Sequence, residues 1–168
     1  MRLDYSTGDL IWIDNNSSIL YYWDQSSIQT VYTGFMHGFQ IDNGTVVYSF
    51  WDGGDYEIAT WAGGSVTQWT SNTYSDAYPV ISGSRVAWMR TLTTNDDWEI
   101  MTSTGGPPIQ LSSNSVSDQG LAMHGSDLFW LASNPEARVW RYDGSTADPV
   151  SAVGDYACDS LIHDADGD

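Results

Sequence analysis

Short apolar stretches that end in an aromatic residue recur along this chain, and each follows a turn that contains Gly, Asn or Asp. The four aromatic residues are Trp12, Tyr48, Trp88 and Trp130, and they lie 36, 40 and 42 residues apart. Repeats of ~40–45 residues are typical of the four-stranded blade of a β-propeller. We therefore expect these four residues to occupy equivalent positions and to be buried between neighbouring blades.

Further strands are expected around each aromatic position. A second strand is expected at residues 19–22, 57–60, 99–102 and 138–141. A more polar third strand is expected at 28–33, 66–70, 109–112 and 149–153. Inner strands that precede the later aromatic positions are expected at 39–41, 78–81 and 121–123. Helices are not expected, because Gly, Asn and Asp interrupt every window in which a helical period would have to be sustained.

The pattern predicts an all-β protein made of β-propeller-type repeats, with about four antiparallel blades in a single domain of residues 1–168. The approximate units are 1–36, 37–75, 76–117 and 118–157, followed by a C-terminal strand and an Asp-rich tail at 158–168. The blades could close into a four-bladed ring or form part of a larger propeller. An ordinary β-sandwich is the alternative, but it would not require four aromatic residues at near-constant spacing.

The second and third units share the most specific motif. In the third unit Asp76 and Pro79 precede Trp88, and residues 97–100 read Asp-Trp-Glu-Ile. The second unit repeats this acidic-aromatic-Glu-Ile segment at 55–58, whereas the first and fourth units lack it. These residues resemble the TolB-like propeller repeats of secreted and cell-surface proteins. The resemblance implies a fold and an extracellular or cell-surface location, but no particular chemistry, because propellers carry many functions.

The charge of the chain excludes two classes of partner. It contains 22 acidic residues, five Arg and no Lys, which gives a net charge of −17. Binding to nucleic acid or to an anionic membrane surface requires clustered cations, so neither is expected. No apolar run is long enough to span a membrane as a helix, so membrane insertion is not expected either.

A search for catalytic motifs finds no nucleophile elbow, no zinc-protease motif and no phosphate-binding loop. Cys158 is the only cysteine, so an internal disulfide is impossible. We therefore expect a protein that is not an enzyme.

Calcium is the expected cofactor, because Asp-rich turns supply the oxygen ligands that this cation prefers. Two hairpins at equivalent places in the second and third units contain such residues. A third Asp-rich segment at the C-terminus begins like a D-x-D-x-D calcium loop. The candidate metal ligands are Asp52, Asp55, Asp96, Asp97, Asp164, Asp166 and Asp168.

The two ends of the chain suggest a way to assemble. Residues 159–163 resemble an inner strand with no aromatic strand after it, while the first unit has only residues 1–5 ahead of its own aromatic strand. We expect 159–163 to pair with residues 1–5 or 8–12. Pairing within one chain would give a closed four-bladed monomer, and pairing between chains would give a filament.

Three functions remain open on this sequence. The first is a non-enzymatic extracellular structural or interaction module that self-assembles by edge-strand pairing or binds other surface proteins. The second is a carbohydrate-binding, lectin-like propeller that presents aromatic residues to glycans. The third is a polysaccharide-degrading propeller enzyme whose catalytic residues follow no common motif.

Overall fold

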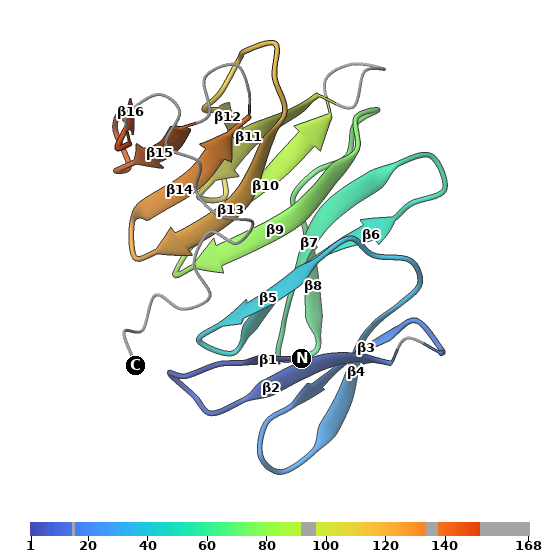
Figure 1. Cartoon of the computed structure of the whole chain (residues 1–168). Helices are drawn as coiled ribbons and strands as arrows, with labels where there is room; N and C mark the ends of the chain where they lie inside the picture. Colours follow the sequence, from blue (N-terminus) through green and yellow to red (C-terminus); the bar gives the residue numbers. More distant parts are fainter. Residues whose placement is uncertain (15, 92–96, 134–137, 152–168) are drawn as a thin grey trace.

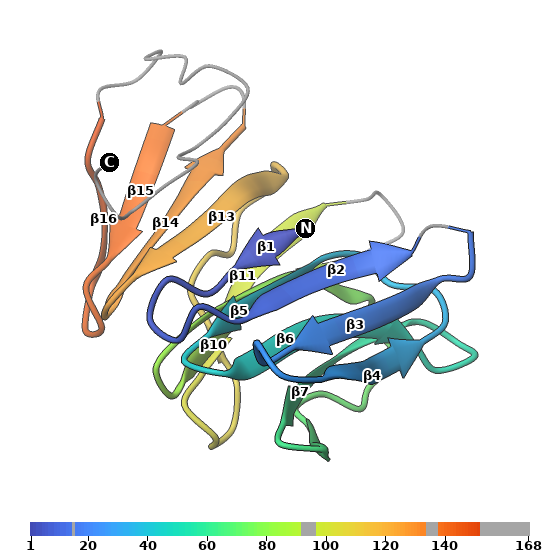
Figure 2. The same cartoon turned by 90° about the horizontal axis from the view of Figure 1, so that it is seen from below.

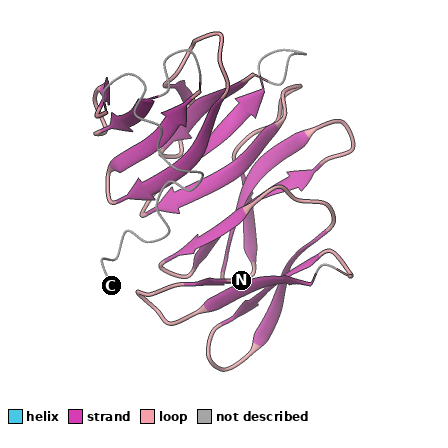
Figure 3. Cartoon of the chain, in the orientation of Figure 1, coloured by secondary structure: helices cyan, strands magenta, loops and turns pink. Residues whose placement is uncertain are grey.

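The computed structural model describes residues 1–14, 16–91, 97–133 and 138–151, which form strands and loops (Figure 3). No helix in this part of the chain is long and apolar enough to cross a membrane. The strands are β1 (Arg2–Leu3), β2 (Leu10–Asp14), β3 (Ile19–Trp23), β4 (Ile28–Thr33), β5 (Phe39–Asp42), β6 (Thr45–Trp51), β7 (Tyr56–Ala62), β8 (Ser65–Gln68), β9 (Asp76–Ser82), β10 (Arg85–Thr91), β11 (Trp98–Ser103), β12 (Ile109–Gln110), β13 (Asp118–His124), β14 (Asp127–Ala132), β15 (Arg138–Tyr142) and β16 (Ala147–Pro149).

These strands form four sheets, and each sheet is an antiparallel meander whose strands follow one another in sequence order. Blade 1 contains β1–β4, blade 2 contains β5–β8, blade 3 contains β9–β12 and blade 4 contains β13–β16. The turn chemistry explains the tight hairpins. Asn43 and Gly44 join β5 to β6 with φ angles of 46° and 72°, and Asn-Gly adopts this left-handed pair at little cost. The all-β, four-blade architecture expected from the sequence is confirmed.

The blades pack face to face in chain order, as Figures 1 and 2 show. Strand β9 of blade 3 contacts both β5 and β6 of blade 2 on one side and β13 of blade 4 on the other. Blade 1 contacts blade 2 through β1 and β5. No contact of this extent joins the described strands of blade 4 to those of blade 1. Within the described residues the four blades therefore form an open series, with one terminal face on blade 1 and another on blade 4.

The core lies between the blades, where apolar side chains of facing sheets meet. Tyr48 of β6 packs in the cluster between blades 1 and 2, Trp88 of β10 between blades 2 and 3, and Trp130 of β14 between blades 3 and 4. Their exposed fractions are 3%, 0% and 1%. In each case the aromatic residue faces the preceding blade. Three of the four aromatic positions are thus buried between blades, as the repeat predicts.

Trp12 departs from that expectation, because it is only partly buried. It occupies the equivalent place on β2, but no described blade precedes blade 1. Its ring instead packs beside Tyr21 of the adjacent strand, with ring centroids 5.4 Å apart. On the opposite face of β2, Ile11 is fully buried against blade 2. The difference comes from the position of the blade in the series and not from the residue itself.

Two strand assignments differ from those expected. The first blade has an inner strand of its own, because Arg2 and Leu3 of β1 pair with Ile11 and Leu10 of β2. The third strand of blade 4 is Ala147–Pro149 and not 149–153, because a tight turn after Asp143 returns the chain early. The strand expected at 159–163 lies outside the described residues.

Candidate functional site

The acidic-aromatic-Glu-Ile segments lie where β7 of blade 2 and β11 of blade 3 begin, and each places one glutamate inside the protein. Glu57 is fully buried and Glu99 is 2% exposed. Each carboxylate is held by the loop that leads to the next blade. The backbone N–H of Asn72 donates to Glu57 at 2.5 Å, and that of Asn114 donates to Glu99 at 3.0 Å. Burial raises the pKa of the Glu57 carboxyl.

Between blades 2 and 3, these loops bring Glu57 close to a second buried carboxylate, Asp76. Asn72 links the two, because its side-chain amide donates to Asp76 at 2.7 Å. Arg90 neutralises Asp76 with a bidentate ion pair at 2.7 and 2.9 Å, and the indole N–H of Trp88 adds a hydrogen bond of 2.8 Å. The Arg90 guanidinium also lies over the ring of Tyr74. This cluster contains its own cation, and the carboxylate of Asp76 is fully hydrogen-bonded.

The equivalent aspartate between blades 3 and 4 is Asp118, which is also completely buried. The side-chain amide of Asn114 reaches its Oδ2 atom at only 3.4 Å, and Oδ1 has no hydrogen-bond partner. The residue directly across the ladder is Ala132, where blade 3 has Arg90. Burial raises the pKa of Asp118 to about 7, and the charges of Glu99 and Asp97 act in the same direction.

A central cavity of about 590 Å³ is shared by the inner strands of all four blades. Arg2 of blade 1, Phe39 of blade 2, Tyr78 of blade 3 and Asp118 of blade 4 contribute to its wall, together with Trp98 of β11. Its lining therefore combines aromatic surface with one cationic and one acidic side chain. A cavity of this size and mixture is suited to a small ligand with apolar and polar faces.

Tyr78 adopts an unusual backbone conformation at this cavity. Its φ angle is 52°, in the left-handed region, while Gly38 of blade 2 and Gly120 of blade 4 hold positive φ angles at the corresponding places. The Tyr78 ring packs edge-on against Trp98, with centroids 5.6 Å apart, and 44% of the side chain is exposed. A non-glycine residue held in this region costs about 1–3 kcal/mol, which marks the position as a candidate for function.

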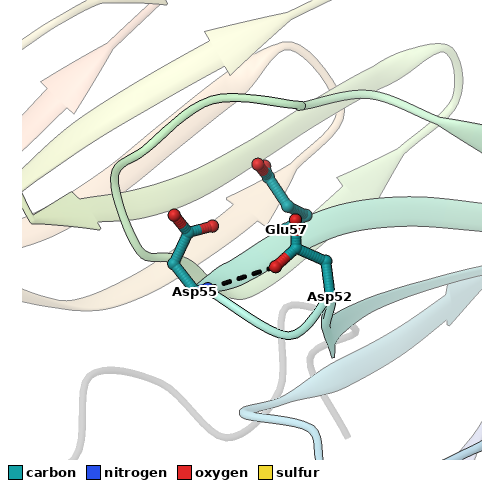
Figure 4. A group of neighbouring side chains, drawn as sticks. All are labelled: Asp52, Asp55 and Glu57. Atoms are coloured by element: carbon teal, nitrogen blue, oxygen red, sulfur yellow. Dashed lines mark hydrogen bonds between the residues drawn. The ribbon is translucent and has the colours of Figure 1, made fainter.

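A third acidic group lies at the hairpin between β6 and β7 (Figure 4). Asp52, Asp55 and Glu57 each offer one carboxylate oxygen, and these oxygens all lie within 4.8 Å of one another. The backbone N–H groups of Gly54 and Asp55 donate to Asp52 Oδ1 at 2.8 and 3.2 Å, and these bonds lower its pKa. Burial raises the pKa of Asp55, with the neighbouring Asp52 charge adding to the effect.

The structure locates only part of the calcium ligand set expected from the sequence. Asp52 and Asp55 come together, and they are joined by Glu57, which was not among the expected metal ligands. Asp97 lies just before β11 and its Oδ1 atom is buried without a hydrogen-bond partner. The remaining candidates, Asp96, Asp164, Asp166 and Asp168, lie outside the described residues.

The buried residues of the two inter-blade clusters were not among the candidates. Glu99, Asp118 and Arg90 are the charged residues of these clusters, and of the three only Glu99 belongs to a motif recognised in the sequence. A signal was present, because Asp76 and Asp118 stand at the same place in two successive units. Only the cross-strand partner, Arg90 in one unit and Ala132 in the next, distinguishes them.

Comparison with known proteins identifies the fold. No protein-family model matches the chain, and no curated protein matches it. Solved structures do match. The β-propeller domain of the Trilobed protease from Pyrococcus furiosus, described as having an open velcro topology, has a TM-score of 0.65 and 8% identity over 88% of this chain and 52% of that one. TolB from Acinetobacter baumannii has a TM-score of 0.60 and 14% identity over 90% of this chain and 43% of that one.

An acylaminoacyl peptidase from Pyrococcus horikoshii matches with a TM-score of 0.63 and 11% identity, over 80% of this chain and 23% of that one. The chain thus spans about half or less of the length of the structures that it matches. These likenesses define a β-propeller-type repeat protein. Its repeats have the fold of TolB-like propeller blades, as the motifs of the second and third units indicated.

Proposed function

We propose that this protein is a non-enzymatic structural or interaction module of the cell surface or extracellular space, which self-associates through its two terminal blade faces. The observation that carries the proposal is the partial exposure of Trp12. Its equivalents Tyr48, Trp88 and Trp130 are all buried against a preceding blade. The face of blade 1 that corresponds to these buried faces therefore has no described blade packed against it.

The open face of blade 1 is apolar over most of its width. The side chains that share it with Trp12 alternate along the strands and pair across them, as the register shows. Trp23 is 36% exposed, Leu3 46% and Ile28 63%. Contiguous exposed apolar surface of this kind is characteristic of an interaction site. The set is Leu3, Leu10, Trp12, Ile19, Tyr21, Trp23 and Ile28.

We expect this surface to bind the face of blade 4 that points away from blade 3. Phe129 and Val139 are half-buried there, at the places where Val47 and Ile58 of blade 2 receive blade 3. A second copy could therefore set its blade 1 on this face in the way that blade 2 packs on blade 1. Such a head-to-tail contact joins different surfaces, so it closes into a ring or continues as a filament. We take a second copy as the occupant because the repeat itself supplies both halves of the interface.

Sedimentation velocity over a range of protein concentrations tests this proposal. We expect the wild-type protein to associate, and we expect Trp12→Ser to lower the apparent mass towards that of one chain while the circular dichroism stays unchanged. Trp51→Ser is the matched control, because Trp51 is also exposed, at 41%, but lies on an internal blade. Association should strengthen with salt, because salt screens the repulsion between copies of charge −17.

A wild-type protein that stays monomeric at all concentrations would overturn the proposal. So would a Trp51→Ser variant that dissociates to the same extent as Trp12→Ser. Association that depends on residues 157–168, and not on Trp12, would favour the edge-strand pairing expected from the sequence. Truncation at residue 156 separates that mode from face-to-face association.

Carbohydrate binding is a second candidate, and the central cavity favours it. Phe39, Tyr78 and Trp98 give this cavity aromatic surface on which a sugar ring can stack. Calorimetric titration with neutral oligosaccharides should then give a binding heat that Tyr78→Ala removes. Equal heats for both proteins would exclude the cavity as the binding site.

A further inference from the structure

The tight turns that follow the inner strands are tied to the preceding blade by an aspartate. Asp4, which directly follows β1 of blade 1, accepts a hydrogen bond of 2.7 Å from the backbone N–H of Gly44 in the turn of blade 2. Asp42, the last residue of β5 in blade 2, accepts one of 2.6 Å from the backbone N–H of Gly83 in the turn of blade 3. The first two junctions therefore each have one carboxylate bound to a turn N–H group.

The junction between blades 3 and 4 lacks this carboxylate. Ser82 ends β9 of blade 3 as Asp42 ends β5 of blade 2, and each is followed by a two-residue turn. The turn of blade 4 begins with Gly125, whose φ angle of 57° matches the 56° of Gly83. The Gly125 N–H has no hydrogen-bond partner among the described residues. A donor that the repeat elsewhere pairs with a carboxylate is therefore left without one.

A surface hollow of about 350 Å³ lies between Ser82 and Gly125, the two residues that the missing carboxylate would join. Hydroxyl groups form much of its wall, and Arg85 is the only charged residue that lines it. None of the lining residues carries a carboxylate. The residues with hydroxyl groups are Ser82, Ser84, Thr104 and Ser126.

Arg85 gives the hollow a positive charge that no described carboxylate neutralises through an ion pair. Its guanidinium lies over the ring of Tyr142 in blade 4, with 5.3 Å between the guanidinium carbon and the ring centroid. In a chain with 22 acidic residues and five Arg, an arginine without a carboxylate partner is unexpected. Arg90 and Arg141, by contrast, each form an ion pair with an aspartate. Arg85 is therefore available to bind an anion from outside the chain.

Two acidic groups lie beside the hollow, and both are already engaged. Asp42 accepts the hydrogen bond from Gly83, and Asp127, which follows Ser126, pairs with Arg141 at 2.8 Å. The net charge of −17 acts mainly from further away, and salt at about 0.1 M screens charges beyond about 10 Å. The protein already holds carboxylates at two successive turns, so a third at the next turn continues the same spacing.

We propose that this hollow binds the carboxylate group of a small organic acid. The carboxylate takes the place of the missing aspartate and accepts hydrogen bonds from the Gly125 N–H and the Arg85 guanidinium. The planar guanidinium suits this ligand, because it can donate two parallel hydrogen bonds to one carboxylate. A carboxylate is favoured over phosphate or sulfate, since carboxylates occupy this place at both preceding junctions and one arginine balances one charge. The site depends neither on self-association nor on sugar binding in the central cavity.

Titration of isotope-labelled protein with sodium acetate, followed by amide NMR spectra at constant ionic strength, tests the proposal. Sodium chloride, sulfate and phosphate are the comparison salts. We expect acetate to shift the Gly125 amide proton downfield in a saturable way, and chloride to leave it unchanged. Arg85→Gln should weaken acetate binding at least tenfold. Arg2→Gln is the matched control, because it makes the same change of charge at an exposed arginine of blade 1 and should leave the binding within twofold.

A second variant returns the aspartate to the repeat. Ser82→Asp should shift the Gly125 amide proton of the free protein in the same direction as acetate does, and it should abolish acetate binding. This variant decides even if Arg85→Gln disturbs the packing on Tyr142. The proposal is overturned if acetate gives no saturable shift at Gly125, or if Arg85→Gln or Ser82→Asp binds acetate within twofold of wild type. Sulfate or phosphate that binds as tightly as acetate would overturn the choice of a carboxylate.

Discussion

Asp76 and Asp118 are the same residue of the repeat in two successive blades, and the protein surrounds them differently. Asp76 accepts hydrogen bonds from an arginine, an indole and an amide, whereas Asp118 interacts only with the Ser112 hydroxyl and, at 3.4 Å, the Asn114 amide, and its Oδ1 atom has no hydrogen-bond partner. The strands, the bridging asparagines and the buried glutamates are alike at both junctions. The residue across the strand therefore decides whether a cation lies directly opposite the buried aspartate. Arg90 lies opposite Asp76, whereas Ala132 lies opposite Asp118.

The junction between blades 1 and 2 shows a third solution. Its cluster is apolar, with Met36 and Phe50 packed against the buried side chains of both blades. Two carboxylates of blade 1, Asp4 and Asp9, are buried near this junction, and they accept hydrogen bonds from the backbone N–H of Gly44 and from the Tyr22 hydroxyl. Repeats of one fold thus stabilise equivalent interfaces by hydrophobic packing or by an internal ion pair.

Removing the internal cation should have the largest effect. Arg90→Ala leaves Asp76 buried without a counter-charge, and breaking a buried pair in this way typically costs about 3–5 kcal/mol. The Arg90 side chain is 13% exposed and that of Asp76 is fully buried. Urea unfolding measures the loss. Arg141→Ala is the control, because its pair with Asp127 is largely exposed and should contribute less than about 1 kcal/mol. Similar losses in both variants would contradict the comparison.

A smaller difference should separate the two buried tryptophans. Trp88→Phe removes ring volume and also the N–H that donates to Asp76, whereas in Trp130→Phe we expect mainly the loss of ring volume. We therefore expect Trp88→Phe to lower the free energy of unfolding by about 1–3 kcal/mol more than Trp130→Phe does. Both residues are at most 1% exposed, which makes the pair well matched. Equal losses would show that the bond to Asp76 contributes nothing.

The junctions should also differ in how strongly their stability depends on pH. Asp118→Asn tests this difference, because it removes the titrating group without changing the size of the side chain. The pKa of Asp118 is raised from 3.8 to about 7, so in metal-free folded protein it holds a proton that the unfolded chain releases. The resulting stabilisation is fully present below about pH 4 and is lost as the pH rises through 7. The slope within this window approaches about 1.4 kcal/mol per pH unit. Asp118 interacts there with Glu99, Asp97, Ser112 and Asn114, and Arg138 lies nearby.

Unfolding free energies of metal-free wild type and Asp118→Asn between pH 4 and 7 measure this contribution. The difference between the two proteins should follow the predicted slope, since the substitution removes only one titrating group. A difference that stays constant over this range would contradict the assignment.

The class of fold and the order of the strands could be predicted from the sequence pattern. Apolar stretches with a period of about 40 residues, separated by Gly, Asn and Asp, allow little but short strands and tight turns. The motif at 55–58 and 97–100 also indicated the kind of blade, through its resemblance to TolB-like propeller repeats. The spacing of residues along the chain was sufficient for these conclusions, since none of them depends on which distant side chains meet.

Which side chain lies opposite each buried aspartate depends on the register of the strands in the folded protein. In blades 3 and 4 the register between the inner strand and the next strand shifts by one residue, between Ala87 and Met89 and between Gln119 and Ala122. This bulge places Asp76 opposite Arg90 and Asp118 opposite Ala132; an unshifted register would pair each aspartate one residue further along. A slip of one residue exchanges the faces of a strand, so the strand pattern alone could not reveal these pairs. The uncovered face of Trp12 likewise follows from its place in the series of blades, because burial depends on what packs against a side chain.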